Sequence, residues 1–90
     1  MTCFRLTSRA LAATLSDGAV LLNLHTKRYF SLNETGTRVW THLQRGTRAE
    51  PIIATLLAEY EVDELEARRT VLSLLDELVG EGLVERVECS

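Results

Sequence analysis

A strand, a tight turn, a second strand and the start of a helix follow one another within residues 20–40, with no room for a long connection. The turn is His25-Thr26-Lys27, and the second strand covers residues 28–32. Two strands joined by so short a turn pair antiparallel. Residues 20–40 therefore predict a β-hairpin that leads directly into a helix containing Trp40.

A second turn signal, Ser16-Asp17-Gly18, lies between the apolar runs 11–15 and 19–24. These runs pair as another hairpin, in which Gly18 takes the positive φ of the turn. Together with residues 28–32 they form a three-stranded antiparallel meander.

Three helices are expected after the meander, each with its own start signal. The first begins within a residue or two of Asn33, a strong N-cap. Pro51 fits best at the first position of the second helix, which favours Glu50 as its cap. Asp63 and Glu66 have the spacing of a capping box and start the third.

Residues 83–87 alternate between apolar and polar side chains like a short wing strand after the third helix. The expected fold class is therefore α+β: a winged helix-turn-helix-like domain with a three-stranded antiparallel sheet followed by three helices. Ninety residues suffice for one core, so we expect a single domain over 1–90 whose core covers about residues 10–87. DNA-binding proteins share this architecture, and the fold alone does not decide the function.

Charge and apolar run lengths exclude several classes of partner. The net charge of −3 has the wrong sign for a protein that neutralises phosphates, so no nucleic-acid partner is expected. No apolar run approaches the roughly 18 residues that span a membrane. Cys3 and Cys89 lie at opposite chain ends, where order is usually lowest, and we expect free thiols in a reducing cytoplasm.

Residue patterns typical of catalysis are missing from the sequence. A nucleophile with a base, paired acids or a set of metal ligands is not found at useful spacing. His25 and His42 are seventeen residues apart and have no zinc-type arrangement of Cys or acids around them. We therefore expect a protein that is not an enzyme and that holds no cofactor or metal, with Trp40 packed in the core.

The third helix has an apolar arc wider than a core-facing helix usually needs. The two halves of this arc consist of Ala67, Val71, Leu74 and Leu78 on one side and Leu65, Leu72, Leu75 and Val79 on the other. Either the wing strand and second helix cover the whole arc, or part of it is open to a partner. Arg68, Arg69 and Asp76 lie in or beside that second half and would give a groove there charged margins.

The strand 28–32 offers a free edge if it is the last strand of its sheet. Phe30 and Leu32 alternate toward the helices, whereas Tyr29 and Ser31 alternate away from them. Unpaired backbone groups at such an edge accept a further strand, and a neighbouring apolar surface supplies pockets for its side chains. The pattern favours a peptide-binding module.

The order and spacing of these elements resemble the PqqD-like family of small leader-peptide recognition domains. The resemblance is carried by VLLNLHTKRYFSLNETGTRVW from Val20 to Trp40, by the acidic helix end Leu56–Tyr60 and by the closing Leu78–Leu83, and covers roughly residues 15–87. Because no enzyme is fused to its end, the chain looks most like the free-standing recognition proteins of lasso-peptide pathways.

The resemblance implies that the leader segment of a ribosomally made precursor peptide adds beside the third strand and packs on the third helix. The bound precursor is then presented to separate enzymes, a leader peptidase and a cyclase or another modifying enzyme. Carried over to this chain, the implied peptide-binding residues are Arg28, Tyr29, Phe30, Ser31 and Leu32 on the strand and Arg68, Arg69, Leu72, Leu75 and Asp76 on the helix.

Three alternatives remain open at this point. The first is a PqqD-type peptide chaperone that serves a radical SAM enzyme in quinone-cofactor biosynthesis. The second is a winged-helix DNA-binding regulator, which the acidic charge and the apolar third helix disfavour. The third is a small structural subunit that pairs with an enzyme through the same groove.

Overall fold

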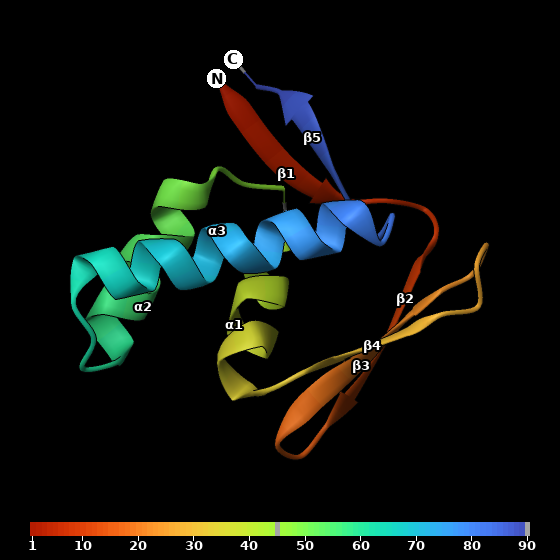
Figure 1. The fold of residues 1–90 in the computed structure, drawn as a ribbon, viewed down its shortest axis with the longest axis horizontal. Helices are drawn as coiled ribbons and strands as arrows, with labels where there is room; N and C mark the ends of the chain where they lie inside the picture. The colour runs from red at the N-terminus through yellow and green to blue at the C-terminus, as the bar shows by residue number, and fades with distance from the viewer. Residues whose placement is uncertain (45, 90) are drawn as a thin grey trace.

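The computed structural model describes residues 1–44 and 46–89. In chain order its elements are β1 (Thr2–Leu6), β2 (Ala10–Leu15), β3 (Gly18–Asn23), β4 (Tyr29–Leu32), α1 (Glu34–Leu43), α2 (Ala49–Glu59), α3 (Glu64–Gly80) and β5 (Val84–Glu88). Three helices packed on antiparallel sheets confirm the expected α+β, winged helix-turn-helix-like class (Figure 1).

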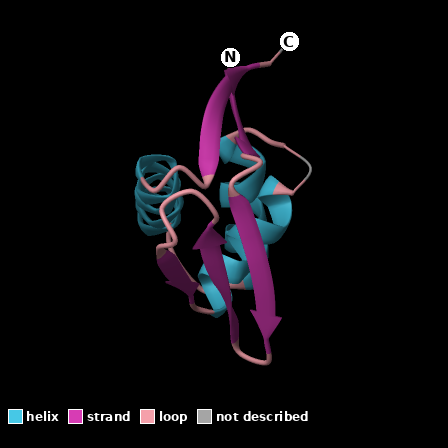
Figure 2. Cartoon of the chain, turned by 90° about the vertical axis from the view of Figure 1, so that its right-hand side faces the viewer, coloured by secondary structure: helices cyan, strands magenta, loops and turns pink. Residues whose placement is uncertain are grey.

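The predicted meander is present as a three-stranded antiparallel sheet with the strand order β2-β3-β4. β3 is central, so β2 and β4 are the two edges (Figure 2). The positive φ expected at Gly18 is wrong. Glycine is needed there for another reason, because a Cβ would lie 2.3 Å from the carbonyl oxygen of Leu32 on β4.

Lys27 takes the left-handed conformation in the turn between β3 and β4, with a φ of 64°. Asn23 holds this turn: its Oδ1 accepts the backbone N–H groups of His25 and Thr26 at 2.8 and 3.1 Å. Its Nδ2 donates to the carbonyl of Glu81 at 2.6 Å. The one buried polar side chain among the described residues therefore links the turn before β4 to the end of α3.

The helix caps agree with the sequence at two of three positions. Asn33 Oδ1 accepts the N–H of Gly36 at 2.8 Å, and Asp63 Oδ1 accepts that of Glu66 at 2.7 Å. Glu50 is not the cap of α2, because the helix begins at Ala49 and its N-cap makes no side-chain bond. The missing N–H of Pro51 is tolerated in any case within the first turn of a helix.

The core lies between the three helices and the inner face of the meander. Trp40 is buried in it, as expected. Its fully buried large side chains are Leu21, Val39, Leu43, Ile52, Ile53, Val71, Leu75, Leu78, Leu83 and Val84. No helix in the described part of the chain is both long and apolar enough to span a bilayer.

The two chain ends form a second sheet that the sequence analysis missed. β1 pairs antiparallel with β5, from Thr2 opposite Glu88 to Leu6 opposite Val84 (Figure 1). This pairing brings Cys3 and Cys89 together as a disulfide. The expectation of two free thiols at disordered termini is therefore wrong.

Candidate functional site

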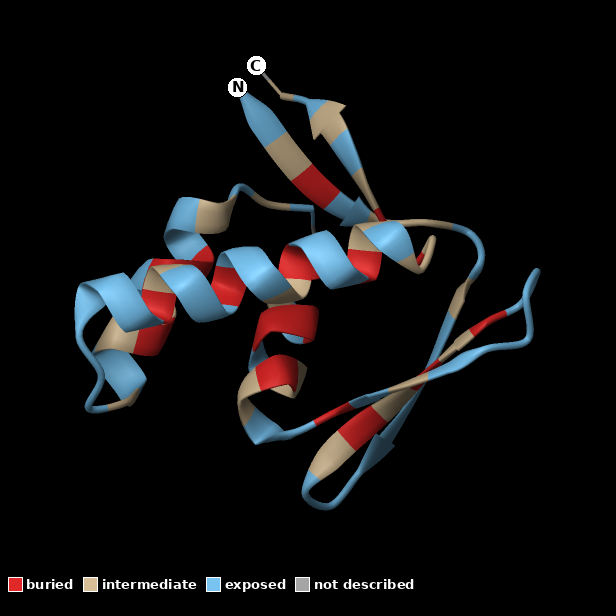
Figure 3. Cartoon of the chain, viewed as in Figure 1, coloured by how far each residue is buried: buried red, intermediate tan, exposed pale blue. Residues whose placement is uncertain are grey.

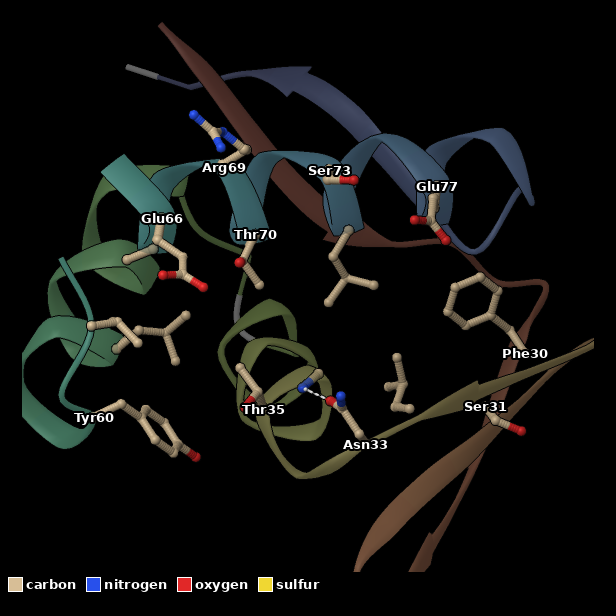
Figure 4. Close-up of a pocket in the computed structure, with 16 residues that line it drawn as sticks. Phe30, Ser31, Asn33, Thr35, Tyr60, Glu66, Arg69, Thr70, Ser73 and Glu77 are labelled. Atoms are coloured by element: carbon tan, nitrogen blue, oxygen red, sulfur yellow. Dashed lines mark hydrogen bonds between the residues drawn. The ribbon is translucent and has the colours of Figure 1, made fainter. Parts of the chain in front are cut away.

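A groove of about 960 Å³ lies between β4, α3, the start of α1 and the end of α2 (Figure 4). Its lining residues are Phe30, Ser31 and Leu32 of β4; Asn33, Thr35 and Gly36 at the start of α1; Leu56, Tyr60 and Val62 around the end of α2; and Glu66, Ala67, Arg69, Thr70, Ser73, Leu74 and Glu77 of α3.

The groove has an apolar floor and a polar α3 wall. Phe30 and Leu74 are half-buried against the core and leave part of their surface open to the groove. Along the wall, Glu66 and Glu77 lie toward opposite ends, with Thr70 between them (Figure 4). The site therefore suits an extended chain with apolar side chains pointing inward and no excess negative charge.

The free edge of β4 borders this groove. The backbone carbonyl of Arg28, just before the strand, accepts the N–H of Asn23 on β3 at 2.9 Å. Arg28 and Asn23 are therefore a hydrogen-bonded pair of the ladder. Such pairs recur at every second residue of an antiparallel ladder. Phe30 and Leu32 therefore bond to β3, and the N–H and C=O groups of Tyr29 and Ser31 point away from β3 toward the open edge.

Four of the sequence-predicted site residues line the groove: Phe30, Ser31, Leu32 and Arg69. Tyr29 is adjacent on β4 with 73% of its surface exposed. Arg28 precedes it and forms an ion pair of 3.3 Å with Glu81.

Arg68, Leu72 and Asp76 lie on a different side of α3, against α2 and β5. Arg68 donates to both carboxylate oxygens of Glu50, at 2.7 and 3.2 Å, and these bonds lower the pKa of that carboxyl and raise the pKa of the guanidinium. Asp76 forms an ion pair with Arg86 of β5. The three residues do not line the groove.

Leu75, one of the predicted peptide-binding residues, has 0% of its surface exposed and lies in the core. Leu74, from the other half of the apolar arc, lines the groove instead. Neighbouring helical positions differ by about 100°, so adjacent leucines face different surroundings.

The sequence analysis also missed the polar residues of the groove wall. Glu66, Thr70, Ser73 and Glu77 recur every three or four positions, which places them on one stripe of α3. That spacing is visible in the sequence beside the apolar positions of the same helix. Among the described residues, no three His, Cys, Asp or Glu side chains gather as metal ligands.

Fold and site together define a small winged-helix-like domain with a free strand edge that opens onto a groove, the geometry that β-strand addition requires. The chain belongs to the PqqD family: the family model described as "Coenzyme PQQ synthesis protein D (PqqD)" matches residues 18–84. The family resemblance read from the sequence is confirmed.

Two solved structures share the fold over nearly the whole chain. One, titled "TbiB1 in Complex with the TbiA(beta) Leader Peptide", is 34% identical with a TM-score of 0.84, and the match covers 90% of this chain and 94% of that one. The other, "Lasso peptide synthetase B1 complexed with the leader peptide", is 29% identical with a TM-score of 0.82, covering 91% and 96%. Comparison with curated proteins gave no match.

Proposed function

We propose that this protein binds the leader segment of a ribosomally made precursor peptide by β-strand addition and does not itself catalyse a reaction. The observation that carries the proposal is the free edge of β4 beside an apolar-floored groove. Two proteins of the same fold have been solved with their leader peptides, which supports the assignment.

In this proposal the leader lies alongside β4 and forms backbone hydrogen bonds with Tyr29 and Ser31. Its alternate side chains then point into the groove, toward Phe30 and Leu74. The α3 wall from Glu66 to Glu77 is about 16 Å long at 1.5 Å per helical residue. An extended segment of about five residues spans that length.

The proposed site keeps the strand residues 28–32 and Arg69 from the family-based assignment. It replaces Arg68, Leu72, Leu75 and Asp76 with the groove residues of α3, Glu66, Thr70, Ser73, Leu74 and Glu77. The two glutamates favour basic or neutral side chains at the ends of the leader segment.

The proposed pathway is lasso-peptide biosynthesis, in which a separate leader peptidase and a cyclase act on the bound precursor. The printed title of one similar structure supports this pathway. The name of the matching family model supports the alternative of a peptide chaperone for a radical SAM enzyme in quinone-cofactor biosynthesis. The two readings share the leader site and differ in the enzyme served.

Calorimetric titration with the precursor peptide encoded beside this chain tests the proposal. We expect a one-to-one complex with a Kd between roughly nanomolar and micromolar, and no binding by a leader of the same composition in scrambled order. Absence of heat at tens of micromolar with the natural leader would refute leader binding. A neighbouring peptidase and cyclase support the lasso pathway, whereas a neighbouring radical SAM enzyme supports the alternative.

A further inference from the structure

β2 forms the edge of the three-stranded sheet that lies opposite to β4. Five of its six residues are exposed (Figure 3). Natural edge strands usually carry Lys or Pro against unwanted pairing, and the sequence of β2, ALAATL, has neither. The other edge strand, β4, follows directly after Lys27 and Arg28. β2 is therefore the edge of this sheet that is least protected against a further strand.

Alternate residues of β2 have backbone groups that point away from β3. The carbonyl of Arg9 accepts the N–H of Leu24 at 2.8 Å, so these two residues are a hydrogen-bonded pair at the start of the ladder between β2 and β3. Because such pairs recur at every second residue, the odd-numbered residues of β2 bond to β3. The N–H and C=O groups of Ala12 and Thr14 then point to the open edge, and both residues are exposed.

This edge is complementary to itself. When two copies of β2 pair antiparallel about a two-fold axis, free backbone groups meet only if even-numbered residues face even-numbered ones. The pairing centred on Ala13 places Ala12 of one copy opposite Thr14 of the other, twice, as hydrogen-bonded pairs. Leu11 of one copy then faces Leu15 of the other at non-hydrogen-bonded positions, where side chains are closest.

The same pairing brings opposite charges together at both ends of the strand. Arg9, just before β2, lies opposite Asp17, in the turn just after it. The two-fold axis repeats this pair at the other end. Among the described residues of a single chain, neither side chain takes part in an ion pair. A slide by two residues in either direction removes both contacts, so the charges favour this one register.

We propose that this protein associates with a second copy of itself through β2, in the register centred on Ala13. The two sheets then form one sheet of six strands in the order β4-β3-β2-β2-β3-β4. Leu11 and Leu15, which are 55% and 53% exposed in the single chain, cover each other across the two-fold axis. Both β4 edges stay open at the ends of the joined sheet, so self-association does not compete with the proposed leader site.

The contact is small and its strength is correspondingly modest. β2 is about 20 Å long at about 3.3 Å per residue. A pairing of that length along one strand edge covers well under the roughly 800 Å² that each partner contributes to a standard interface. We therefore expect a reversible dimer with a Kd of about 10–300 µM.

Sedimentation velocity of the full chain, from about 10 µM to about 1 mM, tests the association. We expect monomers at the low end of this range and mostly dimers at the high end. A wild type that remains monomeric at the highest concentration refutes the proposal.

Arg9→Asp and Asp17→Arg test the register. Each reversal changes the net charge of −3 by two, to −5 and to −1 respectively, so a general charge effect would move the two variants in opposite directions. We expect both to weaken self-association at least about fivefold, and the double variant, which restores the pairs in reversed order, to return to within about twofold of the wild type. Lys27→Asp is the control: it changes the charge as Arg9→Asp does, in the turn between β3 and β4, and should associate like the wild type.

Ala12→Pro tests the backbone pairing, because it removes an N–H at the open edge and leaves the ladder to β3 intact. We expect this variant to stay monomeric at about 1 mM, with thermal unfolding showing that it is folded. An Ala12→Pro dimer as strong as that of the wild type, or no recovery in the double charge reversal, would place the contact elsewhere and overturn the proposal. A dimer that saturating leader peptide dissociates would assign the contact to the β4 edges and overturn it as well.

Discussion

Leu74 and Leu72 are two residues apart on α3 but face different surroundings. Leu74 lines the groove and Leu72 does not. Truncating Leu74 to alanine removes apolar area that a bound leader would cover. We expect Leu74→Ala to weaken leader binding about 5- to 30-fold, which corresponds to about 1–2 kcal/mol.

Leu72→Ala is the matched control, with 40% of its side chain exposed outside the groove. Its affinity should stay within about twofold of the wild type, as for a typical surface substitution. Titration of both variants with the leader provides the comparison, with chemical unfolding to correct for lost stability. A loss confined to Leu72→Ala would move the site to the side of α3 that contacts α2 and β5.

The hairpin between β2 and β3 requires a residue without a side chain at Gly18. Its hypothetical Cβ meets a backbone carbonyl at 2.3 Å, which cannot rotate away. We expect Gly18→Ala to lower the free energy of unfolding by about 2–3 kcal/mol.

Gly80→Ala gives the contrast, since a Cβ at the last residue of α3 would meet nothing within 4 Å. Alanine has the higher helix propensity and the smaller unfolded-state entropy, so this variant should gain up to about 1 kcal/mol. Denaturant unfolding measures both. Equal stability of the two variants would show that β4 moves freely away from Gly18.

At the level of elements, β4 is hydrogen-bonded to β3 along one edge and open along the other. The amides of Phe30 and Leu32 are committed to β3, while those of Tyr29 and Ser31 are free at the edge. Addition of leader should slow amide hydrogen exchange at Tyr29 and Ser31 by at least about tenfold, because each gains an ordered environment and a ladder bond.

The amide of Phe30 is the internal control, since its exchange is already limited by pairing with β3. Residue-resolved amide hydrogen exchange, with and without leader, measures the rates at Tyr29, Phe30 and Ser31 in one experiment. Slowing confined to β5, residues 84–88, would place the partner at the opposite sheet and contradict strand addition at β4.

The sequence predicted the elements whose signals are local. The turns around β3, the caps Asn33 and Asp63 and the alternation of Phe30 and Leu32 all depend on residues a few positions apart, and all were found. Local spacing also predicted which strand borders the candidate site. These signals need no knowledge of what packs against them.

The sequence did not predict features that depend on distant partners. β1 reads as an ordinary terminus, and only its pairing with β5 more than 70 residues later makes it a strand. The groove along α3 likewise depends on distant elements, because it forms where β4, the start of α1 and the end of α2 face the helix.

At the scale of the whole molecule, the two chain ends pair with each other at a distance from the candidate site. β1 and β5 project at one end of the molecule (Figure 1), and no residue of either strand lines the groove. Phe4 anchors β1 in the core, with 8% of its surface exposed. The backbone of Phe4 also pairs with Thr47, through hydrogen bonds of 2.7 and 2.9 Å. The β1–β5 sheet therefore supports the fold without forming the groove.

The disulfide between Cys3 and Cys89 closes a loop across 86 residues, so its main effect is to restrict the unfolded chain. In a reducing compartment this bond would be open. We expect the double variant Cys3→Ser and Cys89→Ser to lose about 2–5 kcal/mol of stability, while its folded fraction binds leader as tightly as the wild type because the groove is separate. Denaturant unfolding and leader titration measure the two effects, and chemically reduced wild type, which should match the double variant, is the control. A large loss of leader affinity at full folding would show that the terminal sheet is coupled to the groove through α3.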